Sequence, residues 1–431
     1  MISLGYHEAM HLMLTLLLAV LLTQATPPMK PTPPGTVPQA PPASPQAPTP
    51  TVKQGGPPAA NQYINWKDGT IFETTFKVAI HSSNVKDPSA PLLFPIINEG
   101  SSSMVNLSSV SASISFNGNL MDSGHGPDIL TGKAMHGVRL LEAPVSYQGT
   151  NPNLLNNAIQ MQFDIEQEIA CWSSEVDEAA MASIAWPTQW PVETLEFQKP
   201  QPLIESDAPI FASALQEVTG GNLHQVPPWV AAKEIVRYCC NTIQTNGTLM
   251  LRGPGSAIRG LDVNGARAAA SSGTGTESDL VCVSVALLRA AGIPARPVIG
   301  LGTPKGKTRN SFLVWGEFYL PNAGWIPFDP KAMRSKGVRS WSLDRSWSSF
   351  GNMSDLNKQI PLAYAFSPGD GSKAYDAWSV WGWSRLQAGA RFPIPIEVWS
   401  ASLQGQQIVA NAWSTPSVIH FTFINRGKYL P

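Results

Sequence analysis

One stretch of the chain, residues 273–330, constrains the fold more than any other. A glycine-rich segment at 273–279 leads into an apolar run at 280–289, which predicts a loop followed by a buried helix. The helix should end at Gly292-Ile-Pro294, because proline cannot continue a helix. Residues 296–300 and 311–320 are dense in β-branched and aromatic residues, which is typical of strands. The predicted order is helix, tight turn, strand, hairpin and strand.

Three motifs in this stretch resemble those of the transglutaminase-like superfamily, which has a papain-like fold and a Cys-His-Asp triad. They are Leu-Leu-Arg-Ala-Ala-Gly-Ile-Pro-Ala-Arg at 287–296, Trp-Gly-Glu-Phe-Tyr at 315–319 and Gly-Trp-Ile-Pro-Phe-Asp-Pro at 324–330. Their joint occurrence at this spacing is a specific signal. The resemblance covers residues 200–337 and implies an α+β fold: a papain-like transglutaminase core, with a helix packed on an antiparallel sheet, preceded by an all-β sandwich-like domain.

The same resemblance locates the three triad positions in this chain. It puts Glu277 where the family has its nucleophilic cysteine, Leu313 where it has the histidine, and Asp329 where it has the aspartate. In a Cys-His pair the histidine takes the thiol proton, the thiolate attacks an acyl carbon, and the aspartate orients the imidazole ring. Neither a glutamate nor a leucine performs these steps. We therefore expect no intact catalytic triad.

Cys282 is the fallback nucleophile, and it follows Glu277 by five residues. At about 100° per residue it points roughly 140° away from Glu277 on the predicted helix. Valines flank it at 281 and 283, so a small buried hydrophobic residue is the favoured interpretation. His420 is the only histidine after this helix, and it lies far outside the strand in which the family carries its histidine.

Glu277 also has a structural explanation. A carboxylate in the first helical turn faces the positive end of the helix dipole, and Thr276 with Asp279 fits a capping pattern. A further alternative gives Glu277, Glu317 and Asp329 an acid-base or metal role in the old cleft, because paired carboxylates serve both purposes. The favoured expectation is that the chain uses no cofactor and no metal.

Two segments precede the folded part. Residues 1–25 are predicted to be a signal peptide or N-terminal anchor, since residues 12–22 are almost wholly apolar but too short to span a bilayer. No Lys or Arg precedes that run, which leaves both possibilities open. Residues 26–60 are a Pro-rich, disordered linker that favours extended polyproline II. This arrangement predicts an exported protein: periplasmic, at the cell surface or secreted.

Three parts follow the linker. Residues 61–200 alternate with period two at 72–80, 110–116 and 159–171, which predicts a β-sandwich-like domain. Residues 201–345 are the predicted transglutaminase-like core, and residues 346–431 a Trp-rich β extension. Trp378, Trp381 and Trp383 in this extension suggest a sugar-binding face, although packing against the core is the favoured interpretation.

Composition limits the partners. The chain is 43% hydrophobic and 14% charged with a formal net charge of -1, so nothing indicates binding to nucleic acid or to an anionic membrane. Membrane contact is expected only through the N-terminal segment. Cys171, Cys239, Cys240 and Cys282 are too few for a disulfide framework, although one bridge is possible.

These observations favour an exported, catalytically inactive transglutaminase-like protein. It would act as a binding or scaffolding module, and the expected partner is a protein or peptide, or a component of the cell envelope. The alternative is an active cysteine protease, amidase or acyl transferase that uses a displaced cysteine.

Overall fold

The computed structural model describes residues 61–81, 92–96, 100–116, 118–126, 130–135, 138–143, 160–247, 249–252, 258–302, 311–366, 383–384, 392–393 and 418–429. The chain divides into two units, Met1–Thr51 and Val52–Pro431, and the first lies outside these ranges. The predicted signal peptide or anchor, the linker and most of the Trp-rich extension, including Trp378 and Trp381, also lie outside the described residues.

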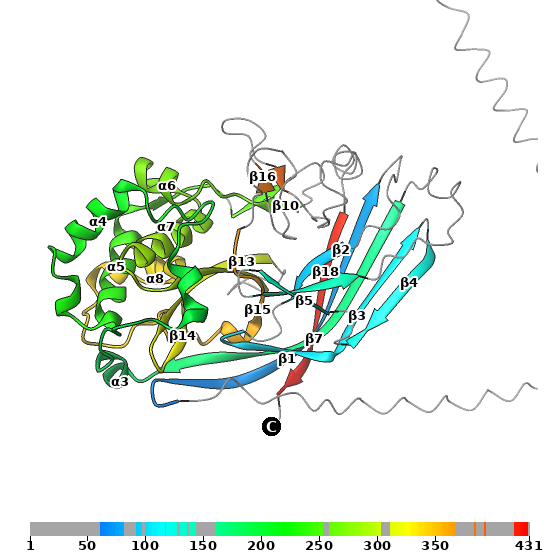
Figure 1. The fold of residues 1–431 in the computed structure, drawn as a ribbon, viewed down its shortest axis with the longest axis horizontal. Helices are drawn as coiled ribbons and strands as arrows, with labels where there is room; N and C mark the ends of the chain where they lie inside the picture. Colours follow the sequence, from blue (N-terminus) through cyan, green and yellow to red (C-terminus); the bar gives the residue numbers. More distant parts are fainter. Residues whose placement is uncertain are drawn as a thin grey trace, which may run out of the picture. The chain divides into compact units, whose positions relative to one another are not determined.

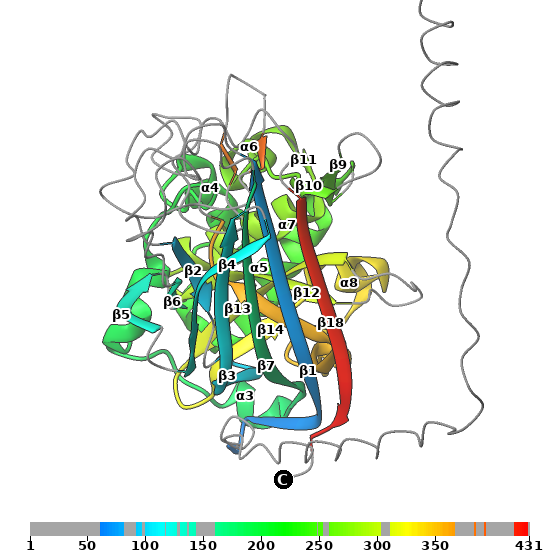
Figure 2. The same cartoon turned by 90° about the vertical axis from the view of Figure 1, so that its right-hand side faces the viewer.

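An antiparallel sheet of five strands dominates the N-terminal part of the second unit. Its order is β18-β1-β7-β3-β4, and Figure 2 shows these strands side by side. The strands are β1 (Ile64–His81), β3 (Ser103–Phe116), β4 (Asn119–His125), β7 (Gln160–Val176) and β18 (Val418–Lys428). The predicted strands at 72–80, 110–116 and 159–171 all belong to it. A second sheet has the order β2-β6-β5, from β2 (Leu92–Ile96), β5 (Leu130–Met135) and β6 (Val138–Ala143).

The edge strand β18 comes from the far end of the sequence. It pairs antiparallel with β1, from Thr70↔Lys428 to Ala79↔Val418. One sheet therefore combines strands from the predicted β-sandwich-like part and from the predicted C-terminal extension. The domain boundaries themselves stay predictions.

The C-terminal part confirms the predicted helix on an antiparallel sheet. Four strands lie in the order β14-β13-β12-β15: β12 (Ala295–Gly302), β13 (Ser311–Leu320), β14 (Gly324–Phe328) and β15 (Gln359–Ala363). Helix α7 (Glu277–Ala290) packs on β12 and β13, and its residues 278–289 are all buried. Helices α4 (Pro209–Thr219), α5 (Pro228–Thr242) and α6 (Ala266–Ser272) contact α7, while α8 (Pro330–Ser335) follows β14 (Figure 1).

Shorter elements connect these parts. The helices among them are α3 (Glu178–Ala182), η3 (Val192–Gln198), η4 (Leu223–Gln225), η6 (Val338–Ser340) and η7 (Leu356–Lys358). The strands are β8 (Gln244–Thr245), β9 (Met250–Arg252), β10 (Ile258–Leu261), β11 (Thr274–Gly275), β16 (Trp383–Ser384) and β17 (Phe392–Pro393). Among the described residues, no helix is both long and apolar enough to cross a membrane.

Glycines in β12 make room for large side chains on the adjacent strand β13 of the four-stranded sheet. A Cβ at Gly300 would lie 2.5 Å from the ring of Trp315, and one at Gly302 would lie 2.7 Å from Cδ1 of Leu313. Any larger residue would displace these side chains, because cores are close-packed. The two glycines therefore make room for Trp315 and Leu313.

Hydrogen bonds join the five-stranded sheet to the core. Asn357 donates from Nδ2 to the carbonyl of Asp68 at 2.7 Å, and the backbone N of Val176 donates to Oδ1 of Asn352 at 3.0 Å. One hydrophobic cluster also runs from Ile64 in β1 to residues of the core sheet. The two parts thus share a continuous interior.

Candidate functional site

The start of helix α7 fixes the position that the resemblance assigns to the nucleophile. Oγ1 of the N-cap residue Thr276 accepts a hydrogen bond from the backbone N of Asp279 at 3.2 Å, and the Asp279 carboxylate accepts one from the backbone N of Thr276 at 2.9 Å. This confirms the predicted capping pattern. Glu277 is therefore the first residue of the helix, where the helix dipole favours a carboxylate.

Asp279 also ties the helix start to the loop before it. Its carboxylate accepts hydrogen bonds from the backbone N of Asn264 at 2.5 Å and from that of Gly265 at 2.9 Å. The Asp279 side chain is wholly buried, and hydrogen bonds to an ionised acceptor offset its desolvation. Residue 277 is thus held by a rigid helix terminus.

Glu277 forms an ion pair with Lys331 at the first turn of α8. Lys331 Nζ lies 2.5 Å from Glu277 Oε2, and the two side chains are 55% and 28% exposed. The position of the family's nucleophile therefore carries a carboxylate that is paired with a neighbouring cation. It has no thiol group that could form a thioester.

Leu313 lies on β13 opposite Gly300 and packs into an apolar cluster. The buried members of that cluster are Val298, Trp315, Met353, Leu356 and Tyr364. The position of the family's histidine is therefore part of the hydrophobic packing. No group at this position accepts a proton.

Asp329 ends β14 and caps α8. Its Oδ1 accepts a hydrogen bond from the backbone N of Ala332 at 2.9 Å. Burial raises the pKa of the Asp329 carboxyl above its ordinary value; the Ala332 hydrogen bond and the cations of Lys331 and Lys336 oppose this, and Glu277 adds to it. The one triad position that keeps its family identity thus has a helix-capping role in this chain.

These three positions line one cavity. It has a volume of about 550 Å³, and Glu277, Leu313 and Asp329 all contribute to its wall. The structure thus brings the predicted site residues together. Other lining residues are polar, as are Lys331, Ser335, Lys336, Ser348, Ser349, Asn352, Ser354, Asp355 and Gln359, or apolar, as are Leu249, Trp315 and Met353.

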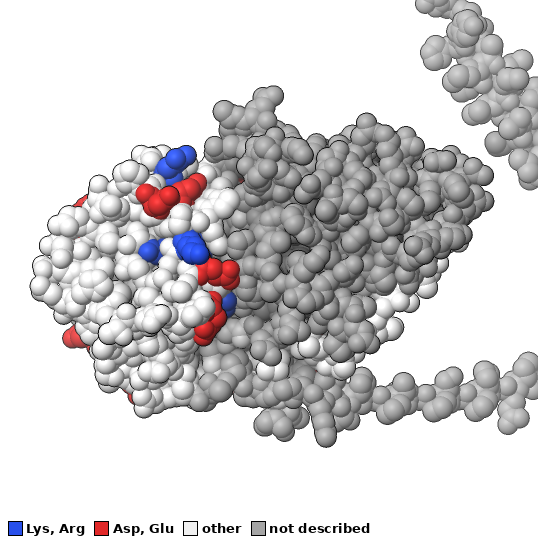
Figure 3. All heavy atoms as spheres, in the orientation of Figure 1, with Lys and Arg blue, Asp and Glu red and all other residues white. Residues whose placement is uncertain are grey.

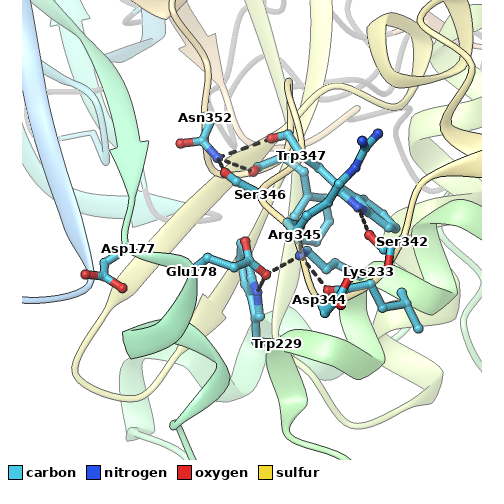
Figure 4. A network of polar contacts seen from close by, with 12 residues as sticks. Asp177, Glu178, Trp229, Lys233, Ser342, Asp344, Arg345, Ser346, Trp347 and Asn352 are labelled. Atoms are coloured by element: carbon cyan, nitrogen blue, oxygen red, sulfur yellow. Dashed lines mark hydrogen bonds and ion pairs between the residues drawn. The ribbon is translucent and has the colours of Figure 1, made fainter.

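A network around Lys233 holds the segment that leads into the cavity wall (Figure 4). The wholly buried Lys233 pairs with Glu178 and donates to the carbonyls of Leu343 at 3.0 Å and Arg345 at 2.8 Å. Its ammonium also lies 5.0 Å from the ring centroid of Trp347, within cation–π range. The segment 343–347 is therefore fixed against helix α5.

Asn352 and Lys336 complete this wall. Asn352 donates from Nδ2 to Oγ of Ser346 at 2.8 Å and to the carbonyl of Trp347 at 3.2 Å. Lys336 donates from Nζ to Oγ of Ser348 at 2.7 Å and to Oγ of Ser349 at 2.9 Å. The residues from 346 to 352 are thus held by side-chain hydrogen bonds.

Sequence reasoning missed most of this wall. Lys331 and Lys336 lie just beyond the Asp-Pro motif, in the first turn and at the C-cap of the short helix α8. No motif in the sequence marks either lysine as part of a site. The residues from 348 to 359 show no regular periodicity, and they lie beyond the predicted end of the core at 345. They reach the cavity wall through isolated bridges such as Phe328↔Phe350, which no sequence motif predicts.

Cys282 does not line the cavity. Its side chain is wholly buried in α7, and burial raises the pKa of its thiol well above the ordinary value; Asp279 and Glu205 add to this and Arg289 opposes it. A thiol in this environment stays protonated, and the thiolate is the nucleophile. All four cysteines are buried and free.

Glu317 is separated from Glu277 and Asp329, contrary to the hypothesis that joined the three carboxylates. It is buried and accepts a hydrogen bond from Nε of Arg296 at 2.8 Å and another from Ser101. Its side chain is not among those that line the cavity. Among the described residues, no three His, Cys, Asp or Glu side chains are placed to hold a metal ion.

Charges on the surface are mixed. In Figure 3 the described part of the visible face is mostly uncharged, and its basic and acidic side chains lie next to one another. On this part of the surface there is thus no large field of one sign.

The family comparison agrees with the resemblance in sequence. Residues 213–330 match the family model described as the transglutaminase-like superfamily. This match contains Glu277, Leu313 and Asp329. No curated protein matches the chain.

Solved structures show distant similarity. A structure described as a proposed cysteine protease from Cytophaga hutchinsonii is 12% identical with a TM-score of 0.46; 85% of this chain and 94% of that chain are covered. The periplasmic domain of TgpA from Pseudomonas aeruginosa is 12% identical with a TM-score of 0.28, and 65% of this chain and 98% of that chain are covered.

Proposed function

Because residues 213–330 belong to the transglutaminase-like superfamily, we propose that this chain is an exported, catalytically inactive protein of that class that binds peptide or cell-envelope material in the old active-site cavity. The observation that carries the proposal is the joint placement of Glu277, Leu313 and Asp329 around one cavity of about 550 Å³. The three positions still surround one cavity, but the cysteine and histidine that acyl transfer requires are replaced.

The first argument is the nucleophile position. Acyl transfer in this family needs a thiolate at the helix terminus, and activation of a cysteine needs an adjacent base or positive charge. Here Glu277 supplies a carboxylate that is paired with Lys331 at 2.5 Å. The positive charge that would lower the pKa of a thiol instead neutralises a carboxylate.

The second argument is the base position. General base catalysis needs a group within hydrogen-bond reach of the nucleophile. Leu313 has no such group and is packed against Trp315 and Met353. A proton from any nucleophile at residue 277 would have no imidazole to accept it.

The cavity walls suit an extended ligand with both polar and apolar parts. Hydroxyl and amide groups at Ser348, Ser354, Asn352 and Gln359 line the same cavity as apolar residues such as Trp315 and Met353. Small-molecule and peptide sites combine apolar area with a few polar groups that fix orientation. The amide groups of a peptide segment would bind the polar groups of the wall, and its apolar side chains would contact the apolar area.

The N-terminal segments support a location outside the cytoplasm. An apolar segment at 12–22 followed by a Pro-rich stretch at 26–60 is the composition of an exported domain on a spacer. A binding module on such a spacer would reach material in the cell envelope. Mass spectrometry of the protein purified from its host would show whether residues 1–25 are removed.

Activity is tested on the chain from residue 61 onward, in comparison with Cys282→Ala. We expect neither protein to hydrolyse peptide amides or to transfer an acyl group to an added amine. We also expect Cys282 to resist alkylation in the native state and to react only in denaturant. Rapid native alkylation of Cys282, together with an activity that Cys282→Ala removes, would establish the alternative of an enzyme with a displaced cysteine.

Binding is tested separately, so that loss of activity and presence of a ligand are judged independently. A panel of peptides and cell-wall fragments is titrated against the native chain and against Ser354→Trp, which fills the cavity from an exposed position. Ser271→Trp makes the same change on an exposed position of α6 that does not line the cavity. We expect a ligand that binds the native chain and Ser271→Trp, and that Ser354→Trp excludes. A panel without any ligand would count against the binding role.

A further inference from the structure

A second cavity lies at the opposite end of β13 from the first. It has a volume of about 340 Å³, and its walls include Trp66 of β1, Tyr319 of β13 and Trp325 of β14. Leu313, Trp315 and Tyr319 share one face of β13, since alternate residues of a strand point the same way. Leu313 and Trp315 line the first cavity, and Tyr319 lines the second.

A buried ion pair separates the two cavities along the strand. Arg296 and Glu317 are neighbours in register on β12 and β13, and Arg296 Nη2 lies 2.8 Å from Glu317 Oε2. Both residues are almost wholly buried, and Arg296 also lines the second cavity. Because Glu317 balances its charge, Arg296 adds hydrogen-bonding capacity to this cavity without a net positive charge.

The guanidinium of Arg296 is stacked between aromatic rings. Its Cζ lies 3.4 Å from the ring centroid of Tyr364 and 3.9 Å from that of Trp325. Both flat faces are therefore covered, and only the edge remains for hydrogen bonds. Nε and Nη2 face Glu317. An acceptor atom of a ligand in the cavity would complete this edge.

Aromatic surface dominates the remaining walls. Trp66, Tyr319 and Trp325 are each partly exposed, and Tyr319 and Trp325 meet edge to face with their ring centroids 5.6 Å apart. Asn322 and Ser101 add amide and hydroxyl groups at the same cavity. Partly exposed aromatic rings beside neutral polar groups favour a ligand with flat apolar faces and polar edges.

From this geometry we infer that the second cavity binds a neutral carbohydrate ring. A pyranose has an apolar face for an aromatic wall and hydroxyl groups for the amide and guanidinium edges. The volume of about 340 Å³ lies within the range of small-molecule sites and suits a short saccharide. The balanced charge disfavours phosphorylated or strongly anionic ligands. This site is independent of the function proposed for the first cavity.

The test titrates the native chain from residue 61 onward with maltotetraose, cellotetraose and the tetramer of N-acetylglucosamine. Tryptophan fluorescence and calorimetry follow binding up to about 10 mM sugar, since a single stacked site gives affinities near the millimolar range. We expect at least one tetrasaccharide to bind. Failure of all three to bind would overturn the inference.

Variants then locate the site. Tyr319→Ala should weaken binding about three- to tenfold, because it removes one aromatic contact, whereas Tyr319→Phe should keep it. Ser354→Trp, which fills the first cavity, should leave sugar affinity unchanged. Circular dichroism confirms that each variant is folded. A folded Tyr319→Ala that binds the sugar as tightly as the unsubstituted chain would contradict a site at the second cavity. Loss of sugar binding in Ser354→Trp would contradict it as well.

Discussion

Lys331 Nζ lies 2.5 Å from Glu277 Oε2. The residue at the position of the family's nucleophile therefore pairs with a lysine that follows Asp329, the position of the family's aspartate, by two residues. Helices α7 and α8 contact each other, and this ion pair joins their first turns. A catalytic site would need this space for the acyl group. In this chain a charge pair occupies it.

The first prediction concerns the strength of that pair. Lys331→Ala should lower the free energy of unfolding by less than about 1 kcal/mol, because the lysine is more than half exposed and water screens such pairs. Urea denaturation of the native chain, Lys331→Ala and Lys331→Arg measures the effect. We expect Lys331→Arg to keep the native value. A loss above about 3 kcal/mol would mean that the pair has a structural role of the buried kind.

The second prediction concerns Asp329. Burial raises the pKa of its carboxyl in the folded protein, so the folded state stabilises the ionised carboxylate less than water does. Asp329→Asn keeps the oxygen that accepts from Ala332 and removes the charge, and asparagine is a good N-cap residue. We expect this variant to be more stable than the native chain at pH 7, by about 0.5–2 kcal/mol.

The sign of the pH dependence follows from linkage. A raised folded-state pKa contributes stability that is fully present below the unfolded pKa of about 3.9 and is lost as the pH rises through the folded value. The advantage of Asp329→Asn should therefore shrink as the pH falls toward 4. Asp329→Ala serves as the control, since it loses the cap and should be less stable at every pH. If the stability gained by Asp329→Asn instead increased as the pH falls, the pKa of Asp329 would not be raised in the folded protein.

The core could be predicted from its sequence because local signals and the fold agree there. Thr276 and Asp279 form a capping box that depends on residues three apart, and Gly292-Ile-Pro294 ends α7 for a steric reason that needs no tertiary information. The triad positions followed from motif spacing alone. All three positions line one cavity.

Other parts of the fold and of the site depend on contacts between distant segments. The pairing of β18 with β1 joins residues more than 300 positions apart, and no periodicity in either strand names its partner. Glu317 looked like a candidate for the cleft because it is a carboxylate near the family's histidine strand. Its pairing with Arg296 became visible only in the register of β12 and β13.

The third prediction concerns Lys233. Burial lowers the pKa of its ammonium, whereas the hydrogen bond and charge of Glu178 oppose this. Lys233→Met would leave Glu178 without its cation and the carbonyls of Leu343 and Arg345 without a donor. Breaking a buried ion pair typically costs about 3–5 kcal/mol, and we expect a loss in that range.

Urea denaturation of Lys233→Met checks this value, with Lys358→Met at an exposed position as the matched control. We expect the control to lie within about 0.5 kcal/mol of the native chain. Because the Lys233 network fixes the segment before the cavity wall, hydrogen exchange at residues 343–352 should also accelerate in Lys233→Met. A variant as stable as the control would show that the network contributes little.

The fourth prediction restores the lost side chains. Glu277→Cys combined with Leu313→His places a thiol at the first position of α7 and an imidazole on β13 in the same cavity. A helix N-terminus and a neighbouring imidazolium both lower the pKa of a thiol. We expect the introduced thiol to react with iodoacetamide at pH 6 at least about tenfold faster in the double variant than in Glu277→Cys alone.

Mass spectrometry after timed alkylation measures the rates, and circular dichroism confirms folding, since a histidine in the apolar cluster around Leu313 costs stability. The native chain is the blank, because its four cysteines are buried. Adding Asp329→Asn to the double variant should slow the reaction again, as the aspartate would no longer orient the imidazole. Equal rates in the single and double variants would mean that side chains at 277 and 313 do not reach each other, and the loss of catalysis would then need an explanation beyond the two replaced residues.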